Sequence, residues 1–286
     1  MVLASAYNST DDNAWCPGCG NFGVLQALKQ ALVSLNLEPW QVIMVSGIGQ
    51  AAKIPHYLKV NCFNGLHGRT MPAAFGVKMA NHKMTVIAAG GDGDAYAEGG
   101  NHFVHAMRRN PDITYLVHDN QIYGLTKGQA SPTTGLGAIT GTTPFGSVDI
   151  PESPLAVAVA MDCSFVARGF AGDIEHLSKI ISAAVKHRGF SLVDILQPCV
   201  TFNKINTREW YKERVYNLDE EADFDPSDRV KAFSKALEWG DRIPTGIIYR
   251  HERQVFEDSV FESGAGSLSR QPLVPPNCLD LMRKYA

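Results

Sequence analysis

Two polar side chains, Asp92 and Asn120, each follow a short apolar segment of the chain. Residues 84–89 and 113–118 have the length and composition of buried strands. Because the carboxyl ends of parallel strands form the edge where open α/β sheets bind their ligands, we expect the two side chains to lie close together. Their oxygens and the backbone carbonyl of Ile122 are hard ligands of the kind that Mg²⁺ prefers, and they leave room for phosphate oxygens.

The residues around Asp92 are mostly glycines, in the order Gly-Gly-Asp-Gly-Asp over residues 90–94. Glycine lets the backbone approach a phosphate group closely because it has no Cβ. The Gly-Asp-Gly sequence, followed after one helix by Asn120, resembles the signature of thiamine-diphosphate enzymes. The alternative is a tight turn at the glycines and a helix cap at Asn120. We favour the diphosphate site because two neighbouring strand ends carry these residues.

Six cysteines are too few for a disulfide scaffold in a chain of 286 residues. Cys16 and Cys19 form a Cys-Pro-Gly-Cys motif, whose spacing lets two thiolates bind one metal ion or cluster, or form a reactive dithiol. A polar tail rather than a strand precedes the motif, which favours the metal site. Cys199 follows a predicted strand at the glycine-rich edge and is a candidate third ligand. We expect Cys163 and Cys278 to be small buried residues.

Two further segments offer groups that could bind an anion. Residues 46–53, Ser-Gly-Ile-Gly-Gln-Ala-Ala-Lys, follow a predicted strand and bring glycine backbone to the same edge of the sheet. His67 and Arg69 lie in a predicted turn, where they could face an anion; a solvent-exposed turn is the alternative.

A long segment without predicted helix or strand, residues 130–153, follows the candidate site. It is rich in Gly, Pro, Ser and Thr, and loops of this length in a compact domain are usually functional or disordered. We expect it to cover the cofactor or to contact a partner. Lys127, just before it, could bind an anionic substrate or coenzyme; a solvated surface lysine is the alternative.

These segments need a sheet with packed helices to position them. Apolar patterning predicts strands at 41–46, 60–63, 84–89, 113–118, 165–168, 190–196 and 246–250, and helices at 24–37, 71–81, 98–109, 154–161, 173–187 and 228–239. This alternation predicts an α/β domain over residues 1–200. Residues 201–286 are charged, with scattered aromatic residues and no evident strand–helix alternation. We expect them to form a C-terminal extension that packs on the domain and on a partner subunit.

The overall composition narrows the functional classes. A hydrophobic content of 45% is ample for a buried core, and a net charge of −3 gives no indication of nucleic-acid binding. No apolar run reaches the length of a membrane span, and the N-terminus lacks the basic-then-apolar order of a signal peptide. The sequence therefore predicts a cytoplasmic protein.

Six motifs occur in one order: Cys-Pro-Gly-Cys, Ser-Gly-Ile-Gly, His-Gly-Arg, Gly-Asp-Gly-Asp, Tyr-Gly-Leu-Thr-Lys-Gly-Gln after Asn120, and Pro-Cys-Val-Thr-Phe-Asn. In this combination the chain resembles the thiamine-diphosphate-binding beta subunits of 2-oxoacid:ferredoxin oxidoreductases over about residues 15–210. The resemblance implies an α/β thiamine-diphosphate-binding fold, with a largely parallel, doubly wound sheet and helices on both faces. It also implies an alpha subunit that supplies the glutamate activating the pyrimidine ring, in a heterodimer or a dimer of heterodimers.

The family pattern assigns roles to matching positions. It makes Asp92, Asn120 and the Ile122 carbonyl ligands of Mg²⁺. The remaining cofactor contacts would be Gly91, Gly93, Asp94, Gly124, Leu125 and Thr126 at the diphosphate, Ser46, Gly47 and Ile48 at the thiazolium side, and His67 at the phosphate edge. Lys53 matches a lysine near the 2-oxoacid carboxylate, and Lys127 matches one near coenzyme A or the electron acceptor.

One position departs from the family pattern. The family's [4Fe–4S] cluster has four cysteine ligands, and Cys16, Cys19 and Cys199 match three of them. Gln50 occupies the position of the fourth cysteine ligand, in a loop whose sequence in the family is Gly-Ile-Gly-Cys. Cys62, Gln50 itself, water or a partner residue could complete the ligation, and loss of the cluster is a further alternative. We favour a retained cluster.

The resemblance implies a coenzyme A-dependent oxidative decarboxylation of a 2-oxoacid of the pyruvate or 2-oxoglutarate class. The products would be acyl-CoA and carbon dioxide, with electrons passed through the cluster to ferredoxin, and the physiological direction stays open. One alternative is a thiamine-dependent decarboxylase or synthase subunit whose Cys-x2-Cys motif binds structural zinc. Another is a non-catalytic electron-transfer subunit that holds a cluster and no thiamine diphosphate.

Overall fold

The computed structural model describes residues 2–261, 266–271 and 277–285. Within them, one sheet has the strand order β2-β1-β3-β4-β6-β5-β8-β7. The strands are β1 (Val42–Ser46), β2 (Asn61–Asn64), β3 (Thr85–Gly91), β4 (Thr114–Asp119), β5 (Phe165–Phe170), β6 (Ser191–Leu196), β7 (Val215–Asn217) and β8 (Ile243–Arg250). Neighbouring strands are parallel, except that β5 and β8 are antiparallel. The carboxyl ends of β1, β3, β4 and β6 therefore open at one edge.

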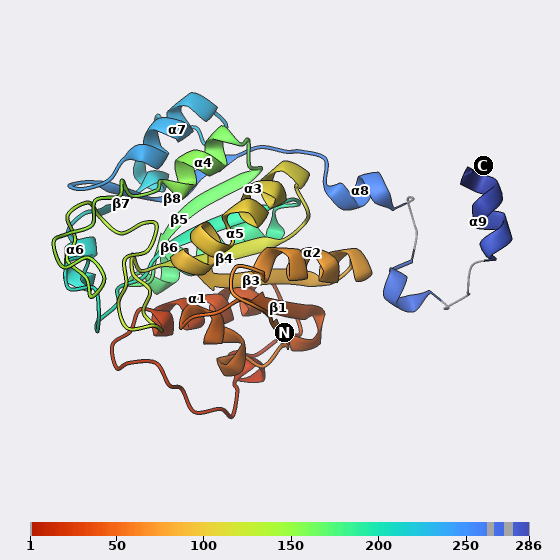
Figure 1. Ribbon diagram of the computed structural model, residues 1–286, viewed down its shortest axis with the longest axis horizontal. Helices are drawn as coiled ribbons and strands as arrows, with labels where there is room; N and C mark the ends of the chain where they lie inside the picture. The colour runs from red at the N-terminus through yellow and green to blue at the C-terminus, as the bar shows by residue number, and fades with distance from the viewer. Residues whose placement is uncertain (1, 262–265, 272–276, 286) are drawn as a thin grey trace.

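Helices cover both faces of the sheet (Figure 1). One face packs against α1 (Asn21–Ser34) and α5 (Ile174–Lys186), and the other against α2 (Thr70–Ala80), α3 (Gly100–Arg109), α4 (Pro154–Ala160) and α7 (Arg229–Leu237). The sequence of α5 shows why it docks, since Leu177, Ile180, Ile181 and Ala184 recur at helical spacing and are all buried. The predicted doubly wound α/β fold is confirmed.

The glycine-rich segment after the third predicted strand differs from the prediction in detail. Strand β3 continues through Gly91, which pairs with His118 of β4 in the parallel sheet. Asp92 then begins a π-helical turn, η4 (Gly93–Glu98), which leads directly into α3. The helix predicted from residue 98 thus has a π-helical entry, and π-helical turns are often found at functional sites.

The expectation of no strand–helix alternation after residue 201 is wrong. Short elements follow in the order α6 (Arg208–Lys212), β7, α7 and β8, and β8 adds to the main sheet beside β5. The described residues beyond β8 include α8 (Phe256–Val260) and α9 (Cys278–Tyr285). The short 3-10 helices are η1 (Ala4–Tyr7), η2 (Pro39–Gln41), η3 (Ala51–Tyr57), η5 (Leu218–Glu220) and η6 (Leu268–Arg270). Division of the chain at residue 200, with the second part on a partner subunit, stays a prediction.

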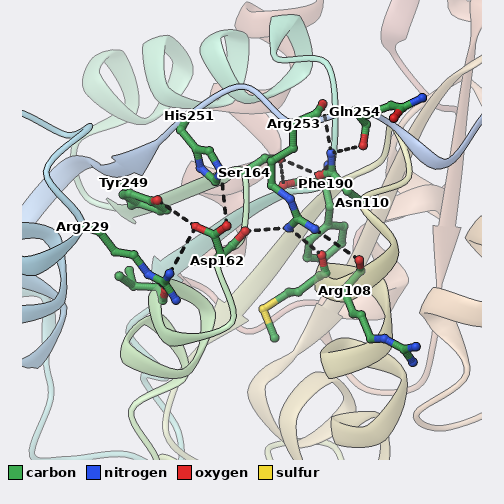
Figure 2. Close-up of polar contacts among 12 residues, drawn as sticks. Arg108, Asn110, Asp162, Ser164, Phe190, Arg229, Tyr249, His251, Arg253 and Gln254 are labelled. Atoms are coloured by element: carbon green, nitrogen blue, oxygen red, sulfur yellow. Dashed lines mark hydrogen bonds and ion pairs between the residues drawn. The ribbon is translucent and has the colours of Figure 1, made fainter. Parts of the chain in front are cut away.

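A polar network fixes the segment after β8 at the edge of the sheet opposite the candidate site (Figure 2). The Arg253 guanidinium donates to the carbonyl oxygens of Met107 at 3.1 Å and Asp162 at 2.6 Å. Asn110, left-handed at φ 55°, ends α3; its Nδ2 donates to the Arg253 carbonyl and its Oδ1 accepts from the Phe190 N–H. These bonds satisfy buried backbone groups where helix and strand ends meet. No helix in the described ranges has the length and apolar character needed to cross a bilayer.

Candidate functional site

The loops after β1, β3 and β4 line one cleft at the carboxyl edge of the sheet. Its lining residues are Ile48, Gly49, Gln50, Ala51, His67, Gly91, Asp92, Gly93, Asp94, Asn120, Ile122, Tyr123, Gly124, Leu125 and Thr126. The structure therefore brings Asp92 and Asn120 together, as the two strand ends predict. The loop after β1 and the turn that carries His67 join them.

Asp92 is a buried carboxyl group held by two hydroxyls. Ser131 Oγ and Thr133 Oγ1 donate to its Oδ2 at 2.5 and 2.8 Å. Burial raises the pKa of Asp92 to about 6, although both hydroxyl bonds favour the charged form. Both bonds use Oδ2, so Oδ1 has no side-chain hydrogen bond among the described residues. Sequence reasoning missed Ser131 and Thr133; the only signal was their place in a loop expected to cover the cofactor.

Thr133 also joins Asp92 to a second buried acid. Its Oγ1 lies 2.7 Å from Oδ1 of Asp119, the last residue of β4. A hydroxyl has one proton to donate, so hydrogen bonds to both acids require one of the two carboxyl groups to be protonated. Burial, with the negative charges of Asp194 and Asp92, raises the pKa of Asp119 well above its ordinary value. The direction of this shift favours Asp119 as the protonated partner, and Asp92 is the acid that lines the cleft.

Asn120 has a fixed side-chain orientation. Its Nδ2 donates at 3.0 Å to Oε1 of Gln197, the residue that follows β6. Its Oδ1 accepts from the Ile122 N–H at 3.1 Å. The Asn203 side chain donates to the Asn120 carbonyl. With the amide N–H group committed, the second lone pair of Oδ1 remains for a metal ion.

Asp94 organises the loops around the cleft. Its Oδ1 accepts from the backbone N–H groups of Ile48 at 3.0 Å and Gly68 at 2.8 Å, and its Oδ2 accepts from Thr70 Oγ1. His67 Nδ1 lies 2.9 Å from Oδ1. A Cβ on Gly47 would lie 2.2 Å from this carboxylate, so only glycine fits there. Both Asp94 oxygens are used within the chain, which leaves the expected diphosphate contact of this residue a prediction.

The turn after β3 closes against the turn after β4. A Cβ on Gly93 would lie 2.2 Å from a ring carbon of Tyr123, so this contact requires glycine. The Tyr123 hydroxyl donates to Glu98 Oε2 at 3.0 Å. Beyond it, Leu125 and Thr126 are exposed at the rim.

The two lysines with expected substrate contacts differ in setting. Lys53, in η3, is half-buried, and neither a hydrogen bond nor an ion pair of its ammonium is found in the described part of the chain. Lys127 is exposed and has a left-handed backbone, at φ 78°.

Ser46, at the end of β1, is buried, and its Oγ accepts from Asn64 Nδ2.

A second pocket adjoins the cleft and brings together the three cysteines predicted as cluster ligands. Its lining residues are Ala14, Trp15, Cys16, Cys19, Asn21, Gln50, Asn120, Gly124, Gln197, Cys199, Val200, Thr201 and Phe202. Burial raises the pKa of the Cys19 thiol to about 11, and Cys199 and Cys16 add to the rise. Gln197 Nε2 donates to Cys19 Sγ at 3.5 Å, and Thr201 Oγ1 donates to Cys16 Sγ at 3.2 Å.

The remaining cysteines lie elsewhere. Cys62 is exposed on edge strand β2 and does not line the pocket. Cys163 is buried as expected, whereas the expectation of a buried Cys278 is wrong, because this residue is exposed on α9. Over the described ranges, no three or more His, Cys, Asp or Glu side chains are placed to hold a single metal ion.

Known proteins match both parts of this architecture. Residues 43–195 match the family described as thiamine pyrophosphate enzyme, C-terminal TPP binding domain. Residues 199–263 match the family described as the C terminal of the pyruvate ferredoxin oxidoreductase beta subunit. The chain is 46% identical over 272 residues to the 2-oxoacid:ferredoxin oxidoreductase subunit beta of Saccharolobus solfataricus, covering 91% of this chain and 89% of the relative. The chain belongs to the 2-oxoacid:ferredoxin oxidoreductase beta subunits.

Other relatives of this beta subunit carry related names. It is 42% identical over 197 residues to the 2-oxoglutarate oxidoreductase subunit KorB of Mycobacterium tuberculosis, covering 69% of this chain and 53% of that protein. Its fold superimposes, with a TM-score of 0.88 and 36% identity, on a solved 2-oxoglutarate:ferredoxin oxidoreductase from Magnetococcus marinus with 2-oxoglutarate, coenzyme A and succinyl-CoA bound. That match covers 91% of this chain and 88% of the other. The family predicted from the six motifs is confirmed.

Proposed function

We propose that this beta subunit, with an alpha subunit, catalyses the coenzyme A-dependent oxidative decarboxylation of a 2-oxoacid of the pyruvate or 2-oxoglutarate class. The reaction uses thiamine diphosphate, Mg²⁺ and a [4Fe–4S] cluster, and it passes electrons to ferredoxin. One observation carries this proposal: the cleft and the cysteine pocket share a wall, because both are lined by Gln50, Asn120 and Gly124. The names of the relatives support the same reaction.

The donor set of the cleft fits Mg²⁺. Asp92 Oδ1, Asn120 Oδ1 and the Ile122 carbonyl would supply oxygen ligands, and Mg²⁺ uses one or two protein carboxylates or carbonyls with substrate phosphates. The diphosphate would lie along Gly91, Gly93 and residues 124–126, where glycines allow close backbone approach. Ser46, Gly47 and Ile48 would contact the thiazolium side, with His67 at the phosphate edge.

Thiamine diphosphate supplies a ring that accepts the electron pair released with carbon dioxide. The chain's own residues place it and keep its surroundings fixed. Ser131 and Thr133 hold the Asp92 carboxylate in one orientation, and Thr133 also links it to Asp119. Lys53 would pair with the 2-oxoacid carboxylate, and Lys127 with coenzyme A or the electron-acceptor side.

The cysteine pocket fits an iron–sulfur cluster in ligand type and position. Three thiols share one pocket with a glutamine in its wall, and thiolates are the usual ligands of such clusters. Because the pocket adjoins the cleft, electrons released at the thiamine ring would have a short path to the cluster. Cys16, Cys19 and Cys199 would hold the cluster in place.

The test uses the chain co-produced anaerobically with its alpha subunit. After addition of pyruvate or 2-oxoglutarate with coenzyme A, the complex should reduce ferredoxin. Acyl-CoA should form in proportion to the ferredoxin that is reduced. Asp92→Ala should abolish Mg²⁺-dependent thiamine diphosphate binding in a folded complex, whereas Asp11→Ala, at an exposed position, should not. Decarboxylation without acceptor reduction, in a zinc-containing colourless complex, would favour the decarboxylase alternative. A cluster without bound thiamine diphosphate would favour an electron-transfer subunit.

The complex itself is part of the proposal. The mass of the native assembly should equal a heterodimer or a dimer of heterodimers, and the isolated beta chain should be inactive because it lacks the pyrimidine-activating glutamate.

A further inference from the structure

Gln50 carries an unpaired polar atom in the wall of the cysteine pocket. Its Oε1 is buried and has no hydrogen-bond partner among the described residues. The backbone at this residue is fixed, because the Trp15 indole N–H donates to the Gln50 carbonyl at 2.8 Å. A buried oxygen without a partner costs free energy, so such an atom in a native structure requires an explanation.

Three side chains of the pocket use their donor groups on other acceptors. The Gln197 amide donates to Cys19 Sγ and to the Pro198 carbonyl, and the Thr201 hydroxyl donates to Cys16 Sγ. The Trp15 indole is used by the Gln50 backbone carbonyl. An amide oxygen has lone pairs and no proton, so it can only accept a hydrogen bond or bind a cation. Gln50 lines the pocket that contains the three thiols, and it also lines the adjoining cleft.

We propose that Gln50 Oε1 is the fourth ligand of the iron–sulfur cluster, completing the set of Cys16, Cys19 and Cys199. This inference rests on the proposed function, which places a cluster in the pocket. A neutral amide oxygen replaces a thiolate, so the cluster and its ligands carry one negative charge less than with four cysteines. Because net charge is one of the factors that set cluster potential, the reduced state is favoured relative to a four-thiolate cluster. The iron at Gln50 is also the one most easily lost.

Loss of that iron gives a direct readout. Oxidation by ferricyanide converts a [4Fe–4S]²⁺ cluster into [3Fe–4S]⁺, with one ferrous ion released and one electron passed to ferricyanide. The product has a spin-½ signal in electron paramagnetic resonance, whereas the starting cluster has none. The rate at which this signal grows therefore measures how firmly the fourth ligand holds its iron.

The experiment compares anaerobically purified full complexes of the wild type, Gln50→Ala and Gln50→Cys, with Gln30→Ala, an exposed position on α1, as the control. Iron, sulfide and thiamine diphosphate are measured in each before oxidation. The [3Fe–4S]⁺ signal should grow at least tenfold faster in Gln50→Ala than in the wild type. In Gln50→Cys it should grow more slowly than in the wild type, and the cluster should have a lower reduction potential. Gln30→Ala should match the wild type. Gln50→Glu, which keeps an oxygen ligand, serves if the alanine variant does not fold, and should retain its iron with a potential below that of the wild type.

Equal rates of iron loss and equal potentials in the wild type and all folded Gln50 variants would overturn the inference. Absence of iron and sulfide from a wild-type complex that binds thiamine diphosphate would overturn it together with the cluster part of the proposed function. Absence of thiamine diphosphate from a complex whose cluster responds to Gln50 as expected would support the inference and contradict the proposed reaction.

Discussion

Replacing Asp92 with Asn is expected to stabilise the ligand-free protein above pH 6 while it abolishes Mg²⁺-dependent cofactor binding. Burial raises the pKa of Asp92 from 3.8 to about 6. Each unit corresponds to about 1.4 kcal/mol, so holding this carboxylate charged in the folded state costs about 3 kcal/mol. At Asp92, the folded state binds more protons than the unfolded state between about pH 4 and pH 6. The contribution of Asp92 to stability is therefore highest below that window, falls as the pH rises through it, and stays lower above.

An asparagine side chain does not titrate, so the stability difference between the variant and the wild type reports Asp92 together with its charge coupling to Asp119. Urea unfolding of the ligand-free complex should show no pH-dependent gain below about pH 4, and a gain for Asp92→Asn of up to about 3 kcal/mol at about pH 8. The gain is smaller if Ser131 or Thr133 loses its hydrogen bond to the new amide. Asp11→Asn, at an exposed site, should show no such dependence. A variant that is less stable than the wild type at about pH 8, or a difference that does not change with pH, would show that burial does not disfavour the charged form of Asp92.

The same carboxyl group links Mg²⁺ binding to pH. The ion binds the deprotonated form, so the Mg²⁺ affinity of the wild type should fall about tenfold for each pH unit below about pH 6. Calorimetric titration with Mg²⁺ and thiamine diphosphate between about pH 5 and pH 8 measures this slope. An affinity that is constant down to about pH 5 would show that Asp92 is not the group that the metal must deprotonate.

Three further predictions concern single residues. Thr133→Val should destabilise the complex by about 1–3 kcal/mol, because two buried acids lose their shared hydroxyl, whereas Thr133→Ser should restore most of the loss in urea unfolding. Gly93→Ala should weaken thiamine diphosphate binding at least tenfold in calorimetry, because the new methyl group meets the Tyr123 ring at 2.2 Å; unchanged affinity would contradict this packing. Lys53→Met should raise KM for the 2-oxoacid with little change in cofactor affinity, and an unaltered KM would remove this lysine from the substrate site.

Much of the fold could be predicted from the sequence because its central strands are buried on both faces. Residues 84–89 and 190–196, for example, are apolar runs that fall in β3 and β6 of the parallel sheet. Of the C-terminal strands, β8 contains the predicted strand at 246–250, whereas β7 was not predicted. Strand β7 has only three residues, and β8 pairs antiparallel with β5, a non-local contact that apolar patterning does not reveal.

The part of the candidate site that could be predicted consists of residues placed directly at the carboxyl ends of strands. Asp92 and Asn120 come together because β3 and β4 are adjacent and parallel. Ser131 and Thr133 could not be found this way, since the course of a long loop depends on packing rather than on periodicity. The part that Asp94 plays in joining two loops likewise depends on partners distant in sequence.

The most direct test of the metal site is a crystal structure of the complete complex with thiamine diphosphate and Mn²⁺ in place of Mg²⁺. We expect an anomalous peak within coordination distance of Asp92 Oδ1, Asn120 Oδ1 and the Ile122 carbonyl, with the diphosphate completing the coordination. A cofactor bound with its metal ion away from these oxygens, or with Asp92 and Asn120 turned out of the cleft, would show that these residues do not form the metal site.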